Sequence, residues 1–476
     1  MHSTEDWDEL LVPVKLRFAL PPTAQHATPG HSYALKNWEI GMWDRLTLGV
    51  AALLMVGVTV AAKKPPPSLK SEDGINLLNQ LDASLKKEYY DPTFGGIDLK
   101  SRFAGAADQM RRATTTEEVY QVMVRVIQDL PGAKLYWEFP AEYGFVRAWK
   151  AKPIGGKFYV TFVLNRSDAA KSLRVGDELM TLNDSPPTQD MIGVPNSSSA
   201  TPAPLETERL VVASPGEKAR EVVVRSEKRL IYPDIPGFLD LPWGNWSWTA
   251  HLDRSVMMWR LPWSSNPLLL RVLPLKDVEP NLNKLLARAQ RYPNLIIDLR
   301  GNSHGSVDEM VAVAAALFDH DVTLATRVGS GSKQPLVAQT HGAKHYGGRV
   351  IVLVDKQTGG PAEVLARTIQ LNQRGEIIGD RTCGCTRERQ TSLLVLGGIK
   401  KPLGFLSLSI PIADFIMPDG ENPEGTGLTP DQTVLPSGED LASGRDPGLE
   451  TALKLAGVQL TLKEQSKRQM IQWHLQ

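Results

Sequence analysis

Apolar residues recur every three or four positions in the first part of the chain, between residues 71 and 130. The first such run contains Ile75, Leu78, Leu81 and Leu85. This period places the side chains on one face of a helix, and it predicts a small helical domain. A second run follows Thr114, and Glu117 three residues later predicts a capping box at its start.

Between residues 143 and 228 the pattern changes to short apolar, β-branched runs separated by polar turns. Phe158–Val163 is one of these runs, and it predicts a strand. Pro215 and Gly216 stand between two further runs and predict a hairpin turn. This part of the chain is therefore expected to be a small β domain.

From residue 278 onward, buried-strand patterns alternate with helical ones. The predicted strands are 295–298, 322–328, 350–355 and 376–380. The predicted helices are 278–291, 307–318 and 361–373. Such alternation is typical of an α/β layer with buried strands, so the predicted fold class is α/β.

The segment Leu46–Ala62 carries no charge over 17 residues, and Lys63, Lys64 and three prolines follow it. Its length is at the low end for a membrane span. If the chain instead starts at Met42 rather than Met1, the same segment fits a secretory signal. A buried core helix is the third interpretation. An anchor and a cleaved signal both place the later residues outside the cytoplasm, as a periplasmic or secreted domain, and the choice between them stays open.

The amino-acid composition limits the kinds of binding partner that we expect for this protein. The 476 residues include 53 basic and 53 acidic side chains, so the formal net charge is zero and nothing indicates a nucleic-acid partner. The two cysteines, Cys383 and Cys385, are too few for a disulfide framework or a zinc cluster, and their spacing leads us to expect no bond between them. We expect His341 and His345 to be solvent-exposed rather than a metal pair, and no cofactor is predicted.

A strand followed at once by a helix organises the later part of the chain. Val350–Val354 is apolar and mostly β-branched, and it leads into Thr358-Gly359-Gly360-Pro361-Ala362-Glu363. Glycines form the turn, and proline stands in the first turn of the helix that follows.

This turn resembles the T-A-S-A-x-E nucleophile turn of the tail-specific, or C-terminal-processing, serine proteases. Asp298-Leu299-Arg300-Gly301-Asn302 is similar to their D-L-R-x-N-x-G-G string, and Glu424–Asp431 to their E-G-x-G-x-x-P-D element. Asp446–Leu453 resembles their closing helix. The resemblance covers residues 71–457 and implies a core with crotonase/ClpP-like layering.

The β domain resembles a PDZ domain. Ser167-Asp168-Ala169-Ala170 and Leu173–Leu179 match its S-x-A-A and L-x-x-G-D-x-L elements in order. The resemblance implies that Tyr143, Gly144, Phe145 and Val146 form the carboxylate-binding loop and first strand. Such a loop binds a peptide C-terminus, and the adjacent strand edge adds the peptide as a further strand.

Three groups that the family's chemistry requires are replaced here. The resemblance implies a serine nucleophile at Gly360 and a lysine base at Cys385, and neither residue can serve in that role. The oxyanion loop is expected to include Gly301, Asn302, His304, Gly305 and Pro361. Proline has no N–H to donate to an oxyanion, and His304 replaces a glycine of the family string.

The sequence therefore predicts a pseudopeptidase that binds peptide C-termini or unfolded segments, or that assembles with an active protease. One alternative is an active peptidase with a relocated nucleophile, Cys385, and His304 as its base. Thr358 is expected to face away from the site. Another alternative is a structural scaffold that binds no peptide.

The predicted organisation has six parts. They are a poorly structured arm at 1–45, a signal or membrane anchor at 46–62, a helical domain at 71–142, a PDZ-like domain at 143–228, a protease-like α/β core at 229–457 and a tail at 458–476.

Overall fold

The computed structural model divides the chain into two compact units, Met1–Ser68 and Leu69–Gln476. It describes residues 71–138, 142–192, 205–231, 248–253, 256–260, 282, 286–302, 305–340, 342–397 and 403–458. The predicted arm, the segment Leu46–Ala62 and the tail after residue 458 lie outside these ranges. Within them, no helix combines the length and apolarity that a membrane crossing requires.

Three helices open the described part: α2 (Ser71–Glu88), α3 (Leu99–Arg112) and α4 (Thr116–Ile127). The predicted capping box of α4 is displaced by one residue. Its N-cap is Thr115, whose hydroxyl accepts from the Glu118 N–H, and the Glu118 carboxylate accepts from the Thr115 backbone. The prediction of Thr114 and Glu117 was wrong because the helix starts one residue later than the apolar period indicates.

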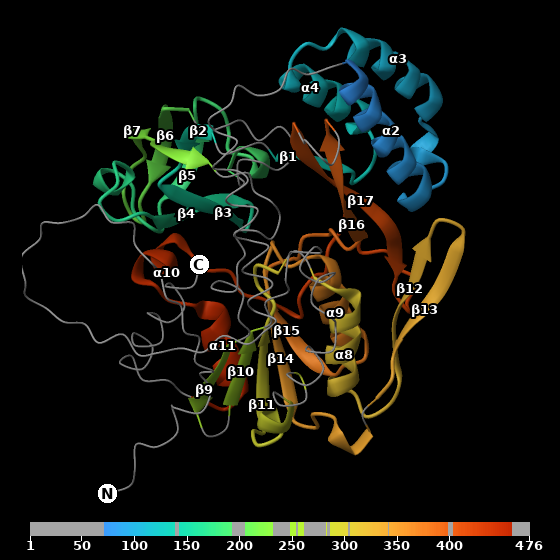
Figure 1. Cartoon of the computed structure of the whole chain (residues 1–476). Helices are drawn as coiled ribbons and strands as arrows, with labels where there is room; N and C mark the ends of the chain where they lie inside the picture. The colour runs from blue at the N-terminus through green and yellow to red at the C-terminus, as the bar shows by residue number, and fades with distance from the viewer. Residues whose placement is uncertain are drawn as a thin grey trace, which may run out of the picture. The chain divides into compact units, whose positions relative to one another are not determined.

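The three helices share a hydrophobic core with a five-stranded sheet (Figure 1). The strand order is β1-β17-β12-β13, and β16 pairs with β17. These strands are β1 (Lys134–Glu138), β12 (Val322–Gly329), β13 (Ser332–Ala338), β16 (Glu388–Leu396) and β17 (Gly404–Ile416). Leu81 and Met123 of the helices lie in one cluster with Leu394 and Leu408 of the strands. Residues more than 250 positions apart thus bury each other.

A second five-stranded sheet is antiparallel throughout, in the order β3-β4-β5-β6-β7. Its strands are β3 (Trp149–Ile154), β4 (Lys157–Val163), β5 (Glu178–Leu182), β6 (Thr207–Ala213) and β7 (Arg220–Arg225). Short helices η2 (Ala169–Lys171) and α5 (Gln189–Ile192) accompany it, and β2 (Glu142–Val146) pairs with β8 (Glu227–Ile231). The predicted strand at Phe158–Val163 and the turn at Gly216 are confirmed.

The third sheet has the order β18-β15-β14-β11-β10-β9, and all its neighbouring strands are parallel except β10 and β9. The strands are β9 (Trp248–Asp253), β10 (Val256–Arg260), β11 (Asn294–Asp298), β14 (Arg349–Val354), β15 (Gly375–Gly379) and β18 (Gln432–Thr433).

Alternation along β14 explains how this sheet is covered on both faces. Val350, Val352 and Val354 lie in the cluster formed with α8 (Val307–Leu317) and α9 (Gly360–Leu371). Ile351 and Leu353 lie in the cluster formed with α11 (Pro447–Leu455). Figure 1 shows α8 and α9 on one side of these strands and α11 on the other. Because successive side chains point to opposite faces, a strand buried on both faces is apolar throughout. The predicted α/β fold class is confirmed.

Candidate peptidase-like site

The carboxyl ends of β11, β14 and β15 meet at one edge of the parallel sheet, and the turn after β14 starts there. Asp355 attaches this turn to the loop after β11, because its carboxylate accepts from the Gly301 N–H at 2.9 Å. The same carboxylate accepts from the Gln357 N–H at 3.0 Å. The D-L-R-G-N loop and the turn are therefore held together by a short polar side chain.

Thr358 faces the interior of the protein, as the sequence indicated. Its side chain is fully buried, and its hydroxyl donates to the Leu299 carbonyl at 3.0 Å. It also accepts from the Asp355 N–H at 2.9 Å. This hydroxyl stabilises the turn and does not face a substrate.

Gly360, which the sequence resemblance aligns with a serine nucleophile, is buried and adopts a φ of 56°. Its N–H donates to the Cys385 carbonyl at 2.8 Å, and the Gly359 N–H donates to the Asn302 carbonyl at 2.7 Å. Pro361, at the start of α9, has no N–H. Both glycine donors of the turn are therefore bound to carbonyls of the protein itself.

Cys383 and Cys385 are joined by a disulfide, so the expectation that they would not bond was wrong. Gly384 lies between them with a φ of 69°, a left-handed conformation that glycine adopts readily. The resulting turn brings the two Cα atoms to 5.3 Å, a separation that disulfides span. Cys385 is consequently not a free thiol here. Its predicted base, His304, lies outside the described residues.

Glu363, in the first turn of α9, binds two other segments at this corner of the molecule. Its carboxylate is fully buried and accepts from the Thr382 hydroxyl, from the Gly384 N–H at 2.9 Å and from the Cys385 N–H at 3.2 Å. The Leu428 N–H donates to it at 3.3 Å. Burial raises the pKa of this carboxyl above its ordinary value, and these hydrogen bonds oppose the rise.

A second, partly buried network holds the D-L-R segment. The Arg300 guanidinium donates to both oxygens of Asp298 at 2.9 Å, and to both oxygens of Asp446 at 2.9 Å. Burial alone would lower the pKa of Arg300, but the two carboxylates raise it well above its usual value. Asp446 also caps α11 by accepting from the Leu449 N–H at 2.9 Å. The network thus joins the end of β11 to the start of the closing helix.

The predicted peptide-binding residues Tyr143, Gly144, Phe145 and Val146 lie in β2, where they pair with Leu230, Arg229, Lys228 and Glu227 of β8. The adjoining strand β3 stands at the end of its sheet in the described strand order. Arg147 lies between β2 and β3 and donates to the Met191 carbonyl of α5 at 2.5 Å and to Glu208. Peptide binding at this edge stays a prediction.

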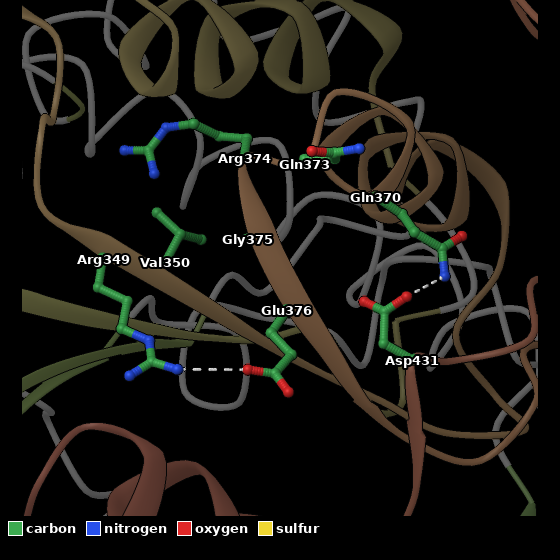
Figure 2. Close-up of a pocket in the computed structure, with 8 residues that line it drawn as sticks. All are labelled: Arg349, Val350, Gln370, Gln373, Arg374, Gly375, Glu376 and Asp431. Carbon is green, nitrogen blue, oxygen red and sulfur yellow. Dashed lines mark hydrogen bonds and ion pairs between the residues drawn. The ribbon is translucent and has the colours of Figure 1, made fainter.

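A cavity of about 410 Å³ lies at the opposite edge of the parallel sheet, where β14 and β15 begin (Figure 2). Arg349 and Glu376 form an ion pair across it at 3.4 Å, and Gln370 donates to Asp431 at 2.7 Å. Four of its polar side chains thus bind one another in two pairs. The cavity lies at the far end of the strands from the turn at Gly360.

Among the described residues, no group of three histidines, cysteines or carboxylates is arranged to hold a metal ion. His345 is half-buried rather than solvent-exposed, and its Nδ1 lies 2.8 Å from the Gly342 carbonyl oxygen. His341 lies outside the described residues.

Sequence reasoning found the turn and the loops but not how they are connected. Glu363 was visible only as the last letter of the turn motif, and an acidic residue in an otherwise apolar first helical turn was the signal of its buried role. The pairing of Arg300 with Asp446 and the disulfide had no local signal. In each case the partners are brought together by the packing of α9, α11 and the loop after β15.

Comparison with known proteins places this geometry in context. The profile of Peptidase family S41 matches residues 271–434. "Carboxyl-terminal-processing peptidase 2, chloroplastic" of Arabidopsis thaliana is 22% identical over 428 residues, which are 84% of this chain and 77% of that protein. "Carboxyl-terminal-processing protease" of Synechocystis sp. is 26% identical over 200 residues, 40% of this chain. The match spans less than half, 43%, of the Synechocystis protein.

The fold is also similar to a solved structure. The crystal structure of mature CPAF superposes with a TM-score of 0.58 over 81% of this chain and 96% of that chain, at 17% sequence identity. At this identity the likeness concerns the fold, and it extends well beyond the segment that the family profile matches.

Proposed function

Because the chain belongs to the tail-specific protease family, peptidase family S41, we propose that it is a pseudopeptidase, which binds polypeptide C-termini or unfolded segments without hydrolysing them. The observation that carries the proposal is the turn at Gly359–Pro361. It has neither a nucleophilic side chain nor an unengaged glycine N–H, and Gly360 itself is buried.

Hydrolysis of a peptide bond by this type of site requires a nucleophile and donors for the oxyanion. Each oxyanion donor contributes roughly 3–4 kcal/mol of transition-state stabilisation. Here the glycine N–H groups bind Cys385 and Asn302, and Pro361 supplies none. A water or side chain that entered the site would therefore still lack stabilisation of the tetrahedral intermediate. These contacts support the proposal that the protein keeps the protease fold but does not hydrolyse peptide bonds.

Retained binding is supported by the antiparallel sheet of residues 149–225, which we interpret as PDZ-like. A peptide would add to the edge of β3, and N–H groups near Tyr143–Phe145 of β2 would donate to its terminal carboxylate. The buried pair of Arg147 and Glu208, at 2.8 Å, fixes the start of β3 beside α5. This arrangement positions an edge strand next to a short helix, as a peptide groove requires.

The test uses the full-length chain and a disordered polypeptide with an apolar C-terminus. Binding is followed by fluorescence anisotropy, and new fragments are sought by mass spectrometry in the same sample. We expect binding without fragments. A matched polypeptide with an amidated C-terminus should bind about ten- to a hundredfold more weakly, because it loses charge-assisted hydrogen bonds of roughly 1.5–3 kcal/mol.

Other results would support other functions. Fragments that vanish in a Cys385→Ala variant would indicate a cysteine-dependent peptidase and contradict the proposal. The absence of binding by either polypeptide would instead favour a structural scaffold. An active protease that copurifies with the chain would identify the partner expected of an assembly subunit.

We also propose an extracytoplasmic location, with residues 46–62 acting as a signal or an anchor. The disulfide supports it, because such bonds persist mainly in oxidising compartments. Fractionation of cells followed by N-terminal sequencing of the mature protein tests both points. A soluble cytoplasmic protein that starts at Met1 would contradict the location, and the identity of the first residue decides between cleavage and retention.

A further inference from the structure

Cys383 and Cys385 are less buried than the turn at Gly359 and Gly360. Gly359 and Gly360 are buried, whereas Cys383 and Cys385 are each partly exposed. The pair lies in the loop after β15, against the first turn of α9. The two cysteine residues are therefore more accessible to solvent than the turn is.

Two positions of this corner, Gly359 and Gly384, have no room for a larger residue. A Cβ atom on Gly359 would lie 2.5 Å from the Cys385 sulfur and 3.2 Å from the Cys383 Cβ. The family motif has alanine at this position, so glycine here removes the atom that would collide with the bonded pair. A Cβ on Gly384 would lie 2.8 Å from the Gly427 nitrogen, so this turn also excludes a larger residue. The replaced residues thus fit one another.

Backbone hydrogen bonds hold both cysteines in place independently of the sulfur–sulfur bond. The Cys383 N–H donates to the Thr358 carbonyl at 2.8 Å, and the Cys385 carbonyl accepts from the Gly360 N–H at 2.8 Å. Glu363 accepts from the N–H groups of Gly384 and Cys385. Because none of these contacts involves sulfur, the loop can keep its position when the disulfide is opened.

The two sulfur atoms differ in their surroundings. The Cys385 sulfur is the nearer of the two to Gly359, the N-cap of the 12-residue helix α9. The start of a helix carries partial positive charge and stabilises an anion there. A thiolate is consequently better accommodated at Cys385 than at Cys383, which makes Cys385 the better leaving group in an exchange reaction.

We propose that Cys383 and Cys385 form a thiol–disulfide exchange site whose substrate is the thiolate of a small thiol or of a polypeptide cysteine. The incoming thiolate attacks the Cys383 sulfur and forms a mixed disulfide with it. The Cys383–Cys385 bond breaks, and its electron pair leaves on Cys385 as a thiolate. A second thiol then attacks the mixed disulfide, so that the two external thiols are oxidised to a disulfide and the protein is left as the dithiol. This activity does not depend on the proposed binding of peptide C-termini.

The first experiment treats the folded full-length chain with dithiothreitol, alkylates it with iodoacetamide and measures its mass. We expect two alkyl groups to be added without loss of the near-UV circular dichroism signal. Reaction with reduced glutathione followed by acid quenching should give a mixed disulfide that peptide mapping assigns to Cys383. Alkylation of untreated protein, or reduction only in denaturant, would overturn the proposal.

Matched variants test the role of each residue. Alkylation of Cys385 in a Cys383→Ser variant should be about tenfold faster than alkylation of Cys383 in a Cys385→Ser variant, because only Cys385 adjoins the helix start. Equal or reversed rates would overturn the assignment of the attacked atom. A Gly359→Ala variant should shift the exchange equilibrium toward the dithiol by about tenfold, because its Cβ overlaps the oxidised pair. An unchanged thiol–disulfide equilibrium in this variant would contradict the inference that glycine at residue 359 makes room for the disulfide.

A competition experiment identifies whether the substrate is a small thiol or a polypeptide cysteine. Glutathione and an unfolded polypeptide with a single cysteine are offered together, and the rate at which each mixed disulfide forms is compared. Either mixed disulfide supports the site, and the faster one identifies its substrate. A chain that exchanges thiols but binds no C-terminal peptide would retain this inference and lose only the proposed peptide binding.

Discussion

Two corners at the carboxyl edge of the parallel sheet have changed in different ways. The corner at Asp298, Arg300 and Asp446 keeps the charged residues of the family motif, and all three are joined by hydrogen bonds of 2.9 Å. The corner at Gly359, Gly360 and Cys385 has glycine, glycine and cysteine where the motifs that it resembles have alanine, serine and lysine. The first corner connects β11 to α11, whereas the second connects α9 to a disulfide loop. This contrast is what our proposal of a pseudopeptidase predicts, because residues that hold the fold are kept while the residues proposed to perform hydrolysis in the family differ.

We expect the largest loss of stability from a substitution in the Asp298–Arg300–Asp446 network. Arg300→Ala would leave the carboxylates of Asp298 and Asp446 without their shared cation, and we expect it to lower the apparent free energy of unfolding by about 3–5 kcal/mol. Urea denaturation followed by circular dichroism measures this. The matched control is Lys86→Ala, which removes the exposed pair with Asp82 and should cost no more than about 0.5 kcal/mol. Equal losses in both variants would show that the Arg300 network contributes no more than a surface pair.

We expect the second largest loss of stability from a substitution of Glu363, which holds the disulfide loop. Glu363→Ala would remove the acceptor of the buried N–H groups of Gly384 and Leu428, and we expect a loss of about 3 kcal/mol. The same denaturation experiment applies, and trypsin digestion should show faster cleavage within residues 380–390. Stability within experimental error of the unsubstituted chain would mean that water replaces the carboxylate.

A third prediction concerns variants that place a serine nucleophile at residue 360. Gly360→Ser alone should give no detectable hydrolysis of a disordered polypeptide, because Cys385 supplies no base and Pro361 no N–H. The positive φ of residue 360 should make this variant less stable by about 1–2 kcal/mol.

A triple variant, Gly360→Ser with Pro361→Ala and Cys385→Lys, is the companion to this test. Fragments from the triple variant alone would support a scaffold that retains the rest of the protease site. Fragments from the single variant would contradict our account of the missing base and donor.

The smallest expected effect is a dependence of stability on pH. Because the pKa of Glu363 is raised in the folded chain, its contribution to the free energy of unfolding is greatest below the ordinary carboxyl pKa. That contribution declines as the pH rises from the ordinary value through the raised one. Glu363→Gln cannot titrate, so the difference in stability between the unsubstituted chain and this variant should decline over the same interval. If this difference in stability instead grew as the pH rose, the pKa of Glu363 would be lowered, and not raised, in the folded chain.

Local patterns predicted much of the fold. Period-3.6 runs indicated the helical region that contains α2 and α4. Continuous apolar runs located β11, β14 and β15 to within one or two residues. The capping box of α4 was displaced by one residue because Thr114 and Thr115 both precede acidic residues at suitable spacing. Such errors arise where neighbouring residues offer the same hydrogen bond and only the helix geometry selects one.

The sequence by itself determined the absence of a serine at Gly360 and of an N–H at Pro361, since these follow from residue identity alone. It also determined the strand-turn-helix arrangement that places them, because apolar period and turn residues act locally. Only the tertiary structure decided that Cys383 bonds to Cys385 over a left-handed Gly384, and that a buried Glu363 binds their loop. It likewise decided that α2 and α4 share a core with β16 and β17. These features depend on atoms from separate segments that meet only when the sheets and helices pack, and no local pattern encodes that meeting.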